Sequence, residues 1–297
     1  MIYDISHVTR YSYEDRVAST TLVLRVTPRD GSGQHCVDHA LSISPQPQSV
    51  ATERDFFGNT VKIAVVETGL LDLNIEARAR VEVSRPAAPP PRSGPMLLEI
   101  VASASQQTSL APDSPAHFIF PSPQVRLTPE IAAFAAQSFD GGRSVLDGSR
   151  DLAARIRKDF KYEPKSTAVN TPVEQAFAQR RGVCQDFAHI MISVLRSLGV
   201  PAAYVSGYIR TIPPPGRPRL AGADATHAWV SVWCGEQIGW IGIDPTNAVD
   251  AGNDHVTLAI GRDFSDVSPI YGVFLGSGAQ ALEVGVDVVP VTASASN

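Results

Sequence analysis

The sequence has few cysteines, no long apolar run and no excess of basic charge. The three cysteines among 297 residues cannot build a disulfide framework, and their odd number leaves at least one free thiol. No uninterrupted apolar stretch approaches the roughly 18 residues that a membrane-spanning helix needs. The opening residues also lack the basic and apolar regions of a secretory signal peptide. These absences predict a cytoplasmic protein without a membrane partner, because free thiols persist in a reducing compartment.

The balance of charge excludes one large class of partners. The chain carries 25 Lys and Arg residues against 30 Asp and Glu residues, a formal net charge of −5. A general nucleic-acid-binding protein needs a basic excess to neutralise phosphates, so we expect no nucleic-acid partner. Hydrophobic residues make up 43% of the chain and charged residues 19%, which is typical of folded globular domains. The length favours two domains rather than one.

The first part of the chain has the pattern of an antiparallel β-sandwich. Apolar and polar residues alternate over 3–11, 21–26 and 36–43, and short turn-forming segments separate such runs. Short strands at this spacing are typical of two packed antiparallel sheets. The proline-rich segment 84–95 can neither pair in a sheet nor continue a helix. We therefore predict that residues 1–95 form a β-sandwich domain with its linker.

The second part, residues 96–297, mixes helical and strand patterns. Thr128 followed by Pro129 has the form of a helix N-cap and first turn, and that helix is expected to reach about Phe139. A second helix is expected over 144–160. Strand-like runs follow, and they cover 202–210, 227–234, 240–244, 255–260 and 282–289. Helices against an antiparallel sheet predict an α+β domain.

A helix with one buried face is predicted directly after Gly182. Apolar residues recur at spacings of three and four over 187–198, which is the period of an amphipathic helix. Gly199 and Pro201 end it, as a glycine and a trailing proline commonly do. Cys184 would then lie in the first turn, where the positive end of the helix dipole favours a thiolate over a thiol. A thiolate on such a rigid helix is a candidate nucleophile.

Two later segments supply the other groups that a thiol nucleophile needs. His227 and Asp244 lie on successive strand-like runs, and adjacent antiparallel strands would bring them side by side. The histidine could act as the base, and the aspartate could orient its ring. We therefore predict Cys184, His227 and Asp244 as catalytic residues.

Three motifs carry a resemblance to a known family. They are Gly-Val-Cys-Gln-Asp-Phe-Ala-His at 182–189, Thr-His-Ala-Trp-Val at 226–230 and Ile-Asp-Pro-Thr-Asn at 243–247. In this order and spacing they resemble the bacterial transglutaminase-like cysteine peptidases, and residues 7–13 and 55–59 resemble the N-terminal β-domain of that family. The resemblance implies a papain-like or transglutaminase-like α+β core that hydrolyses or transfers an amide or isopeptide bond of a peptide or protein substrate.

The resemblance also implies supporting residues and partners. Tyr162 corresponds to a donor upstream of the nucleophile that stabilises the oxyanion. Gln185 and Asp186 are supporting residues next to the nucleophile. Proteins that resemble peptide ligases are expected as partners, because this family tends to accompany them in bacterial genomes. No cofactor is expected.

Other interpretations of the same residues stay open. The residues that could gather round zinc are Cys184, His189, His227, Asp244 and His255. Cys184 and His189 would point away from each other on one helix, so we expect no metal. The fold could instead serve as a non-catalytic protein-interaction module, although such relatives usually lose the cysteine or the histidine. Hydrolysis and acyl transfer both remain, because the shape of the cleft chooses between water and an amine. The loop 211–224 is expected to border that cleft.

Overall fold

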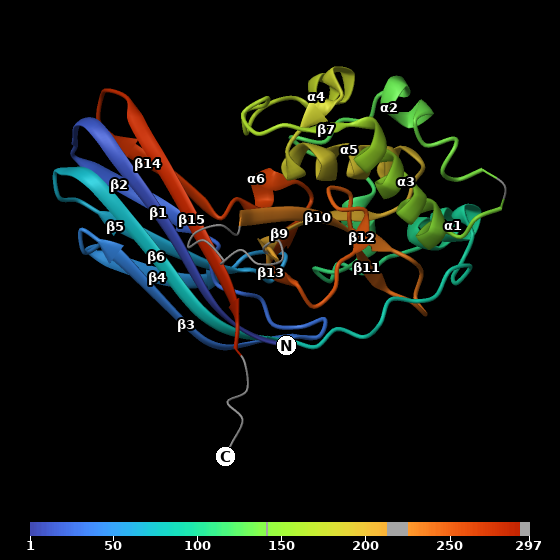
Figure 1. The fold of residues 1–297 in the computed structure, drawn as a ribbon, viewed down its shortest axis with the longest axis horizontal. Helices are drawn as coiled ribbons and strands as arrows, with labels where there is room; N and C mark the ends of the chain where they lie inside the picture. The colour runs from blue at the N-terminus through green and yellow to red at the C-terminus, as the bar shows by residue number, and fades with distance from the viewer. Residues whose placement is uncertain (141, 213–224, 292–297) are drawn as a thin grey trace, which may run out of the picture.

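The computed structural model describes residues 1–140, 142–212 and 225–291, and it shows a β-sandwich beside a unit of helices and sheet (Figure 1). The two sheets of the sandwich have the strand orders β15–β1–β6–β3 and β14–β2–β5–β4. Their strands are β1 (Ile2–Val17), β2 (Ser19–Leu24), β3 (Gln34–Ser44), β4 (Ser49–Arg54), β5 (Thr60–Val66), β6 (Leu70–Val83), β14 (Ile270–Leu275) and β15 (Gln280–Pro290). Buried and exposed residues alternate along β1 and β6, as in any sheet with one face on a core. The predicted antiparallel β-sandwich is confirmed.

The second unit is built round a sheet in the order β12–β11–β10–β9–β13. Its strands are β9 (Ala202–Ile209), β10 (Ala225–Trp233), β11 (Trp240–Asp244), β12 (Val249–Asp250) and β13 (His255–Gly261). The helices are α1 (Leu97–Ser105), α2 (Pro129–Ala133), α3 (Val145–Asp159), α4 (Val173–Gln179), α5 (Cys184–Ser197) and α6 (Phe264–Val267), with a 3-10 helix at Pro115–Phe118. Helix α5 is buried over most of its length between the sheet and helices α2, α3 and α4 (Figure 1). The predicted α+β core is confirmed.

The chain returns to the sandwich at its end. β14 pairs with β2, and β15 pairs with β1. The prediction that residues 96–297 form the second domain alone is therefore wrong for β14 and β15. Alternation along 282–289 indicates a strand correctly, but it does not indicate the neighbouring strand, because that partner lies almost the whole chain away. Within the described ranges, no helix is both long and apolar enough to cross a membrane.

Two side-chain amides of the sandwich hold the edge strand β13. Gln34 accepts a hydrogen bond from the backbone N–H of Thr257 at 2.8 Å and donates to its carbonyl oxygen at 2.9 Å. Asn59 makes the same pair of hydrogen bonds with Ile260, at 2.9 and 2.8 Å. A side-chain amide offers one acceptor and donors in the manner of a peptide group, so it can stand in for a neighbouring strand. The sandwich thereby fixes β13, which begins with a residue of the candidate site.

Replacing Asn59 with alanine should lower the free energy of unfolding by about 1–3 kcal/mol, because the N–H and carbonyl of Ile260 lose these partners. Asn59 is 0% exposed, so water does not replace the amide without rearrangement. The measurement is the shift of the urea midpoint at an unchanged m value. The exposed Asn170 is the matched control, and its replacement by alanine should cost less than about 0.5 kcal/mol. Equal effects at the two positions would contradict the role given to Asn59.

Candidate active site

The turn before α5 fixes the position of Cys184. The backbone N–H of Val183 donates to Asp186 Oδ2 at 2.8 Å, and Thr167 Oγ1 donates to the same oxygen at 2.7 Å. A Cβ atom on Gly182 would come within 2.6 Å of that oxygen, which accounts for glycine there. Burial raises the pKa of Asp186, against the lowering effect of the hydrogen bonds. Asp186 therefore shapes the turn that presents Cys184.

Tyr162 lies beside the same turn. The short strand β7 (Lys161–Tyr162) pairs in parallel with β8 (Arg181–Gly182), which places Tyr162 opposite Gly182. The tyrosine is 43% exposed. Burial, and then the charge of the nearby Cys184, raise the pKa of Tyr162. The structure thus brings Tyr162 close to the predicted nucleophile.

His227, on β10, is hydrogen-bonded to Asp244 and also interacts with Cys184. Its Nε2 lies 2.8 Å from Asp244 Oδ2, and Nε2 is the donor because a carboxylate oxygen only accepts. Nδ1 is then the ring atom left for the hydrogen bond with the Cys184 side chain. Burial opposes charge on the imidazole, but the hydrogen bonds to Asp244 and Cys184 outweigh it and raise the pKa of His227 to about 10. The structure brings the three predicted residues together in the order Cys184, His227, Asp244.

Asp244 is held from several sides at the end of β11. Its Oδ1 accepts from the backbone N–H groups of Thr246 and Asn247 at 2.8 and 3.2 Å. Its Oδ2 also accepts from Asn247 Nδ2 at 2.7 Å and from His255 Nε2 at 3.2 Å. Burial alone would raise the pKa of Asp244, but the hydrogen bonds from His227 and His255 outweigh it and hold the pKa well below its usual range. The carboxylate therefore stays ionised and fixed in orientation.

His255 is a partner of Asp244 that sequence reasoning missed. The backbone N–H of Gly252 donates to His255 Nδ1 at 3.3 Å, so the proton of the neutral ring lies on Nε2, which faces Asp244. From the sequence, His255 was named only among the residues that could gather round zinc, and the strand-like pattern there did not indicate its hydrogen bond to Asp244.

The indole of Trp229 packs against both imidazole rings. Its centroid lies 6.2 Å from that of His227 and 5.2 Å from that of His255. A Cβ atom on Gly207 of β9 would come within 2.5 Å of this indole. Glycine at position 207 therefore leaves space for the indole that packs against the two rings.

A cleft of about 620 Å³ opens over Cys184 and His227. One wall belongs to the second unit and includes Gln185, whose side-chain amide donates to the carbonyl of Val169 at 2.8 Å. The opposite wall comes from strands β1, β14 and β15 of the sandwich. Gln185 therefore holds a wall of the cleft together. Residues 213–224 of the loop that was predicted to border the cleft lie outside the described residues.

A metal ion would have to compete with the hydrogen bonds of this site. Among the described residues, the possible ligand atoms of His227, Asp244 and His255 all lie within 4.8 Å of one another. Asp244 Oδ2 already accepts from both rings, so each facing nitrogen carries a proton where a metal would bind. His189 accepts a hydrogen bond from the backbone N–H of Phe264 at 3.2 Å instead. The arrangement of His227, Asp244 and His255 fits a hydrogen-bonded network better than a metal site.

Comparison with known proteins identifies the family. An uncharacterized protein of Mycobacterium tuberculosis is 40% identical over 294 residues, which span 97% of this chain and 92% of that protein. The bacterial transglutaminase-like N-terminal region matches residues 3–82, and the transglutaminase-like superfamily matches residues 132–245. This chain is a bacterial transglutaminase-like protein.

This transglutaminase-like protein also resembles one protein over part of its sequence and another in its overall fold. A protein-glutamine gamma-glutamyltransferase of Pseudomonas aeruginosa is 36% identical over 106 residues, which are 33% of this chain and 16% of that protein. The crystal structure of a candidate cysteine protease from Cytophaga hutchinsonii aligns with 99% of this chain and 92% of that chain, with a TM-score of 0.75 and 20% identity. The latter establishes a shared fold across both units.

The superfamily match of the transglutaminase-like protein covers the candidate triad and ends directly after Asp244. His255 lies beyond that match, on the strand that the sandwich holds through Gln34 and Asn59. Through its hydrogen bond to His255, Asp244 is thus linked to β13, which lies outside the matched segment and contacts the N-terminal region.

Proposed function

We propose that this protein is a thiol-dependent enzyme that hydrolyses or transfers the acyl group of an amide in a peptide-like substrate. The observation that carries the proposal is that Cys184 and His227 line one open cleft, where His227 is hydrogen-bonded to the buried Asp244. The partial match to a protein-glutamine gamma-glutamyltransferase supports it, because that name describes acyl transfer from an amide.

In the proposed mechanism the sulfur of Cys184 attacks the amide carbon as a thiolate, a C–S bond forms, and the carbonyl oxygen takes the negative charge. Protonated His227 gives its Nδ1 proton to the departing amine as the C–N bond breaks. Water or a second amine then loses a proton to Nδ1, attacks the thioester and releases the thiolate. Asp244 accepts a hydrogen bond from Nε2–H throughout and stays ionised, which keeps Nδ1 directed at Cys184.

Two donors are proposed for the oxyanion. The backbone N–H of Cys184 lies in the first turn of α5, where an N–H has no partner within the helix. The second is the hydroxyl of Tyr162, which carries its proton at neutral pH, as tyrosines do. Burial and the nearby Cys184 raise its pKa further. Gln185 and Asp186 support the walls and the turn through their bonds to Val169 and Val183.

Alkylation with iodoacetamide at pH 6 tests the proposal. We expect Cys184 to react faster than Cys36 and Cys234, because burial raises the pKa of those two thiols and protonated His227 lies beside Cys184. The advantage should persist to about pH 9, because the pKa of His227 is about 10. In His227→Ala the rate of Cys184 alkylation at pH 6 should fall at least about ten-fold. Mass spectrometry of the peptides over time gives each rate.

His35→Ala is the matched control, because this histidine is exposed on the sandwich. Its replacement should leave the alkylation rate of Cys184 unchanged. Slow and equal labelling of all three cysteines, unaffected by His227→Ala, would contradict the proposal. That result would favour the non-catalytic interaction module.

A further inference from the structure

The wall that the sandwich contributes to the cleft is apolar and exposed. Leu282 and Val284 of β15 are 55% and 51% exposed, Tyr271 of β14 is 59% exposed, and all three line the cleft that holds Cys184. Tyr11 of β1, which lies opposite Leu282 in the sheet register, lines it too. We name these four residues the apolar wall. Large apolar side chains gathered at an open cavity are typical of a surface that a ligand covers.

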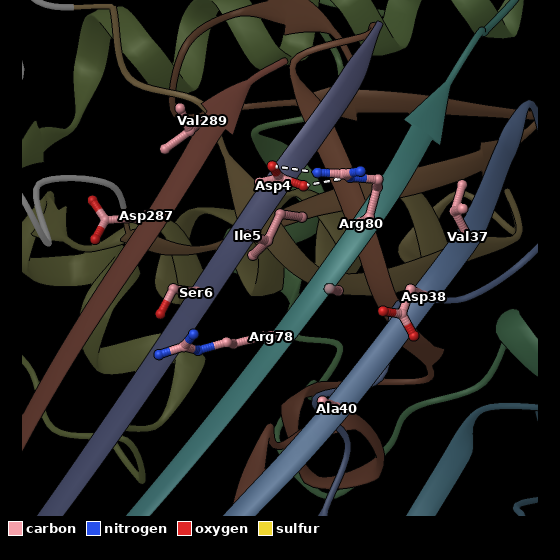
Figure 2. Close-up of a pocket in the computed structure, with 11 residues that line it drawn as sticks. Asp4, Ile5, Ser6, Val37, Asp38, Ala40, Arg78, Arg80, Asp287 and Val289 are labelled. Atoms are coloured by element: carbon pink, nitrogen blue, oxygen red, sulfur yellow. Dashed lines mark hydrogen bonds and ion pairs between the residues drawn. The ribbon is translucent and has the colours of Figure 1, made fainter.

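The acidic and basic side chains of the sheet that contains β1 and β15 lie on the face that points away from the cleft. Among the described residues that line the cleft, none is Asp, Glu, Lys or Arg. On the outer face Asp4 pairs with Arg80 at 2.7 Å, and Arg78 and Asp38 lie close by (Figure 2). Successive residues of a strand point to opposite faces, so the sequence places charge outward and excludes it from the cleft. Apart from Cys184 and His227 themselves, a charged group on a ligand would find no opposite charge among the described lining residues.

The spacing of the apolar wall suits an extended chain. Leu282 and Val284 are two residues apart on one strand, and therefore about 7 Å apart along it, which is also the repeat of side chains on one face of an extended peptide. The cleft volume of about 620 Å³ is within the range of sites that enclose small ligands. The cavity can thus hold an amide at Cys184 together with a neighbouring side chain.

We propose that the apolar wall binds a bulky apolar side chain of the acyl donor, next to the amide that Cys184 attacks, so that the sandwich selects the substrate. This inference rests on the proposed function, because it places the wall in the same cleft as the nucleophile. The ligand is a peptide in extended form with an uncharged, large residue at this position.

Peptidyl chloromethyl ketones test the proposal without a known substrate. The rate at which they alkylate an active-site thiol depends on how tightly their peptide part binds in the cleft. The probes are acetyl-phenylalanyl, acetyl-alanyl and acetyl-aspartyl chloromethyl ketone, and each alkylation rate of Cys184 is divided by the rate with iodoacetamide. We expect the phenylalanyl probe to react at least about ten-fold faster than the other two. In the double variant Leu282→Asn, Val284→Thr this preference should fall about ten-fold, after each rate is divided by that variant's own iodoacetamide rate.

Val289→Thr is the matched control on the same strand. Val289 is also exposed, but it points to the outer face (Figure 2), so the preference should remain. Equal rates for the three probes, a faster aspartyl probe, or a preference that survives the double variant would each overturn the role of the apolar wall. If iodoacetamide itself fails to label Cys184 selectively at pH 6, the proposed function fails and the inference with it. Thermal midpoints of the variants confirm that both remain folded.

Discussion

Replacing Cys184 with alanine should remove acyl transfer and leave the protein folded. Wild-type protein treated with p-nitrophenyl acetate should release a burst of p-nitrophenol and gain one acetyl group on Cys184. The burst should be absent in Cys184→Ala, and turnover of any amide substrate should fall at least about 10⁴-fold, as expected when a nucleophile is lost. Cys184 is half-buried in the first turn of α5, where alanine is well tolerated. The burst amplitude, the acetyl mass shift and the thermal midpoint together give the result.

The other two cysteines provide the controls. Cys234 is buried with its Sγ 3.6 Å from the carbonyl of Val232, and Cys36 contacts the carbonyl of Asp38 on the sandwich. Neither lines the cleft, so Cys36→Ala and Cys234→Ala should keep the full burst. A burst that survives in Cys184→Ala would place the nucleophile elsewhere and refute the proposed mechanism.

The positions of the candidate site residues were largely predictable, because these residues lie in local motifs. Helix α5 was expected from its apolar period and from Gly199, and it forms at Cys184–Ser197. The hydrogen bond between His227 and Asp244 agrees with their expected places on neighbouring strands, since β10 pairs with β11. His255 could not be paired in the same way. Strands β10 and β9 lie between β11 and β13 in the sheet, so no adjacency argument leads from Asp244 to His255.

The fold class was predictable from the sequence, but the pairing of the strands was predictable only in part. Local alternation predicted β1 and β15 as strands, yet their pairing joins the two ends of the chain. Helix α1 was not predicted, because the sequence pattern there is irregular. The helix after Thr128 ends at Ala133 rather than near Phe139. Periodicity reports which face of a segment is buried, and it carries no information on the distant segment that buries it. The apolar wall of the cleft depends on such distant pairing, so it could only be found in the structure.

A second large effect is expected from Asp244→Asn. Asparagine keeps the size of the side chain, but its NH₂ group can face His227 and favour the tautomer with the proton on Nδ1, toward Cys184. His227 would then be unable to hold the thiolate or accept a proton from water. We expect kcat to fall roughly 10²–10⁴-fold with little change in KM. Single-turnover acylation and the pH 6 alkylation rate measure the loss. Asp250→Asn is the control on the next strand, because Asp250 pairs with Arg150 at 2.7 Å instead, and its kcat should stay within about two-fold.

The stability of Asp244→Asn should differ from that of the wild type in a pH-dependent way. Folding lowers the pKa of Asp244, so its stabilisation is present above about 3.9, the value of an unfolded aspartate, and is lost as the pH falls below it. Folding raises the pKa of His227 from 6.5 to about 10, so its contribution is complete below about 6.5 and is lost as the pH rises toward 10. The difference in thermal midpoint should therefore be largest between about pH 4 and 6.5 and should shrink on both sides. A difference that stays constant from well below pH 4 up to about pH 10 would mean that Asp244 stabilises the fold by packing alone, and that an ionised pair with His227 does not exist in the resting protein.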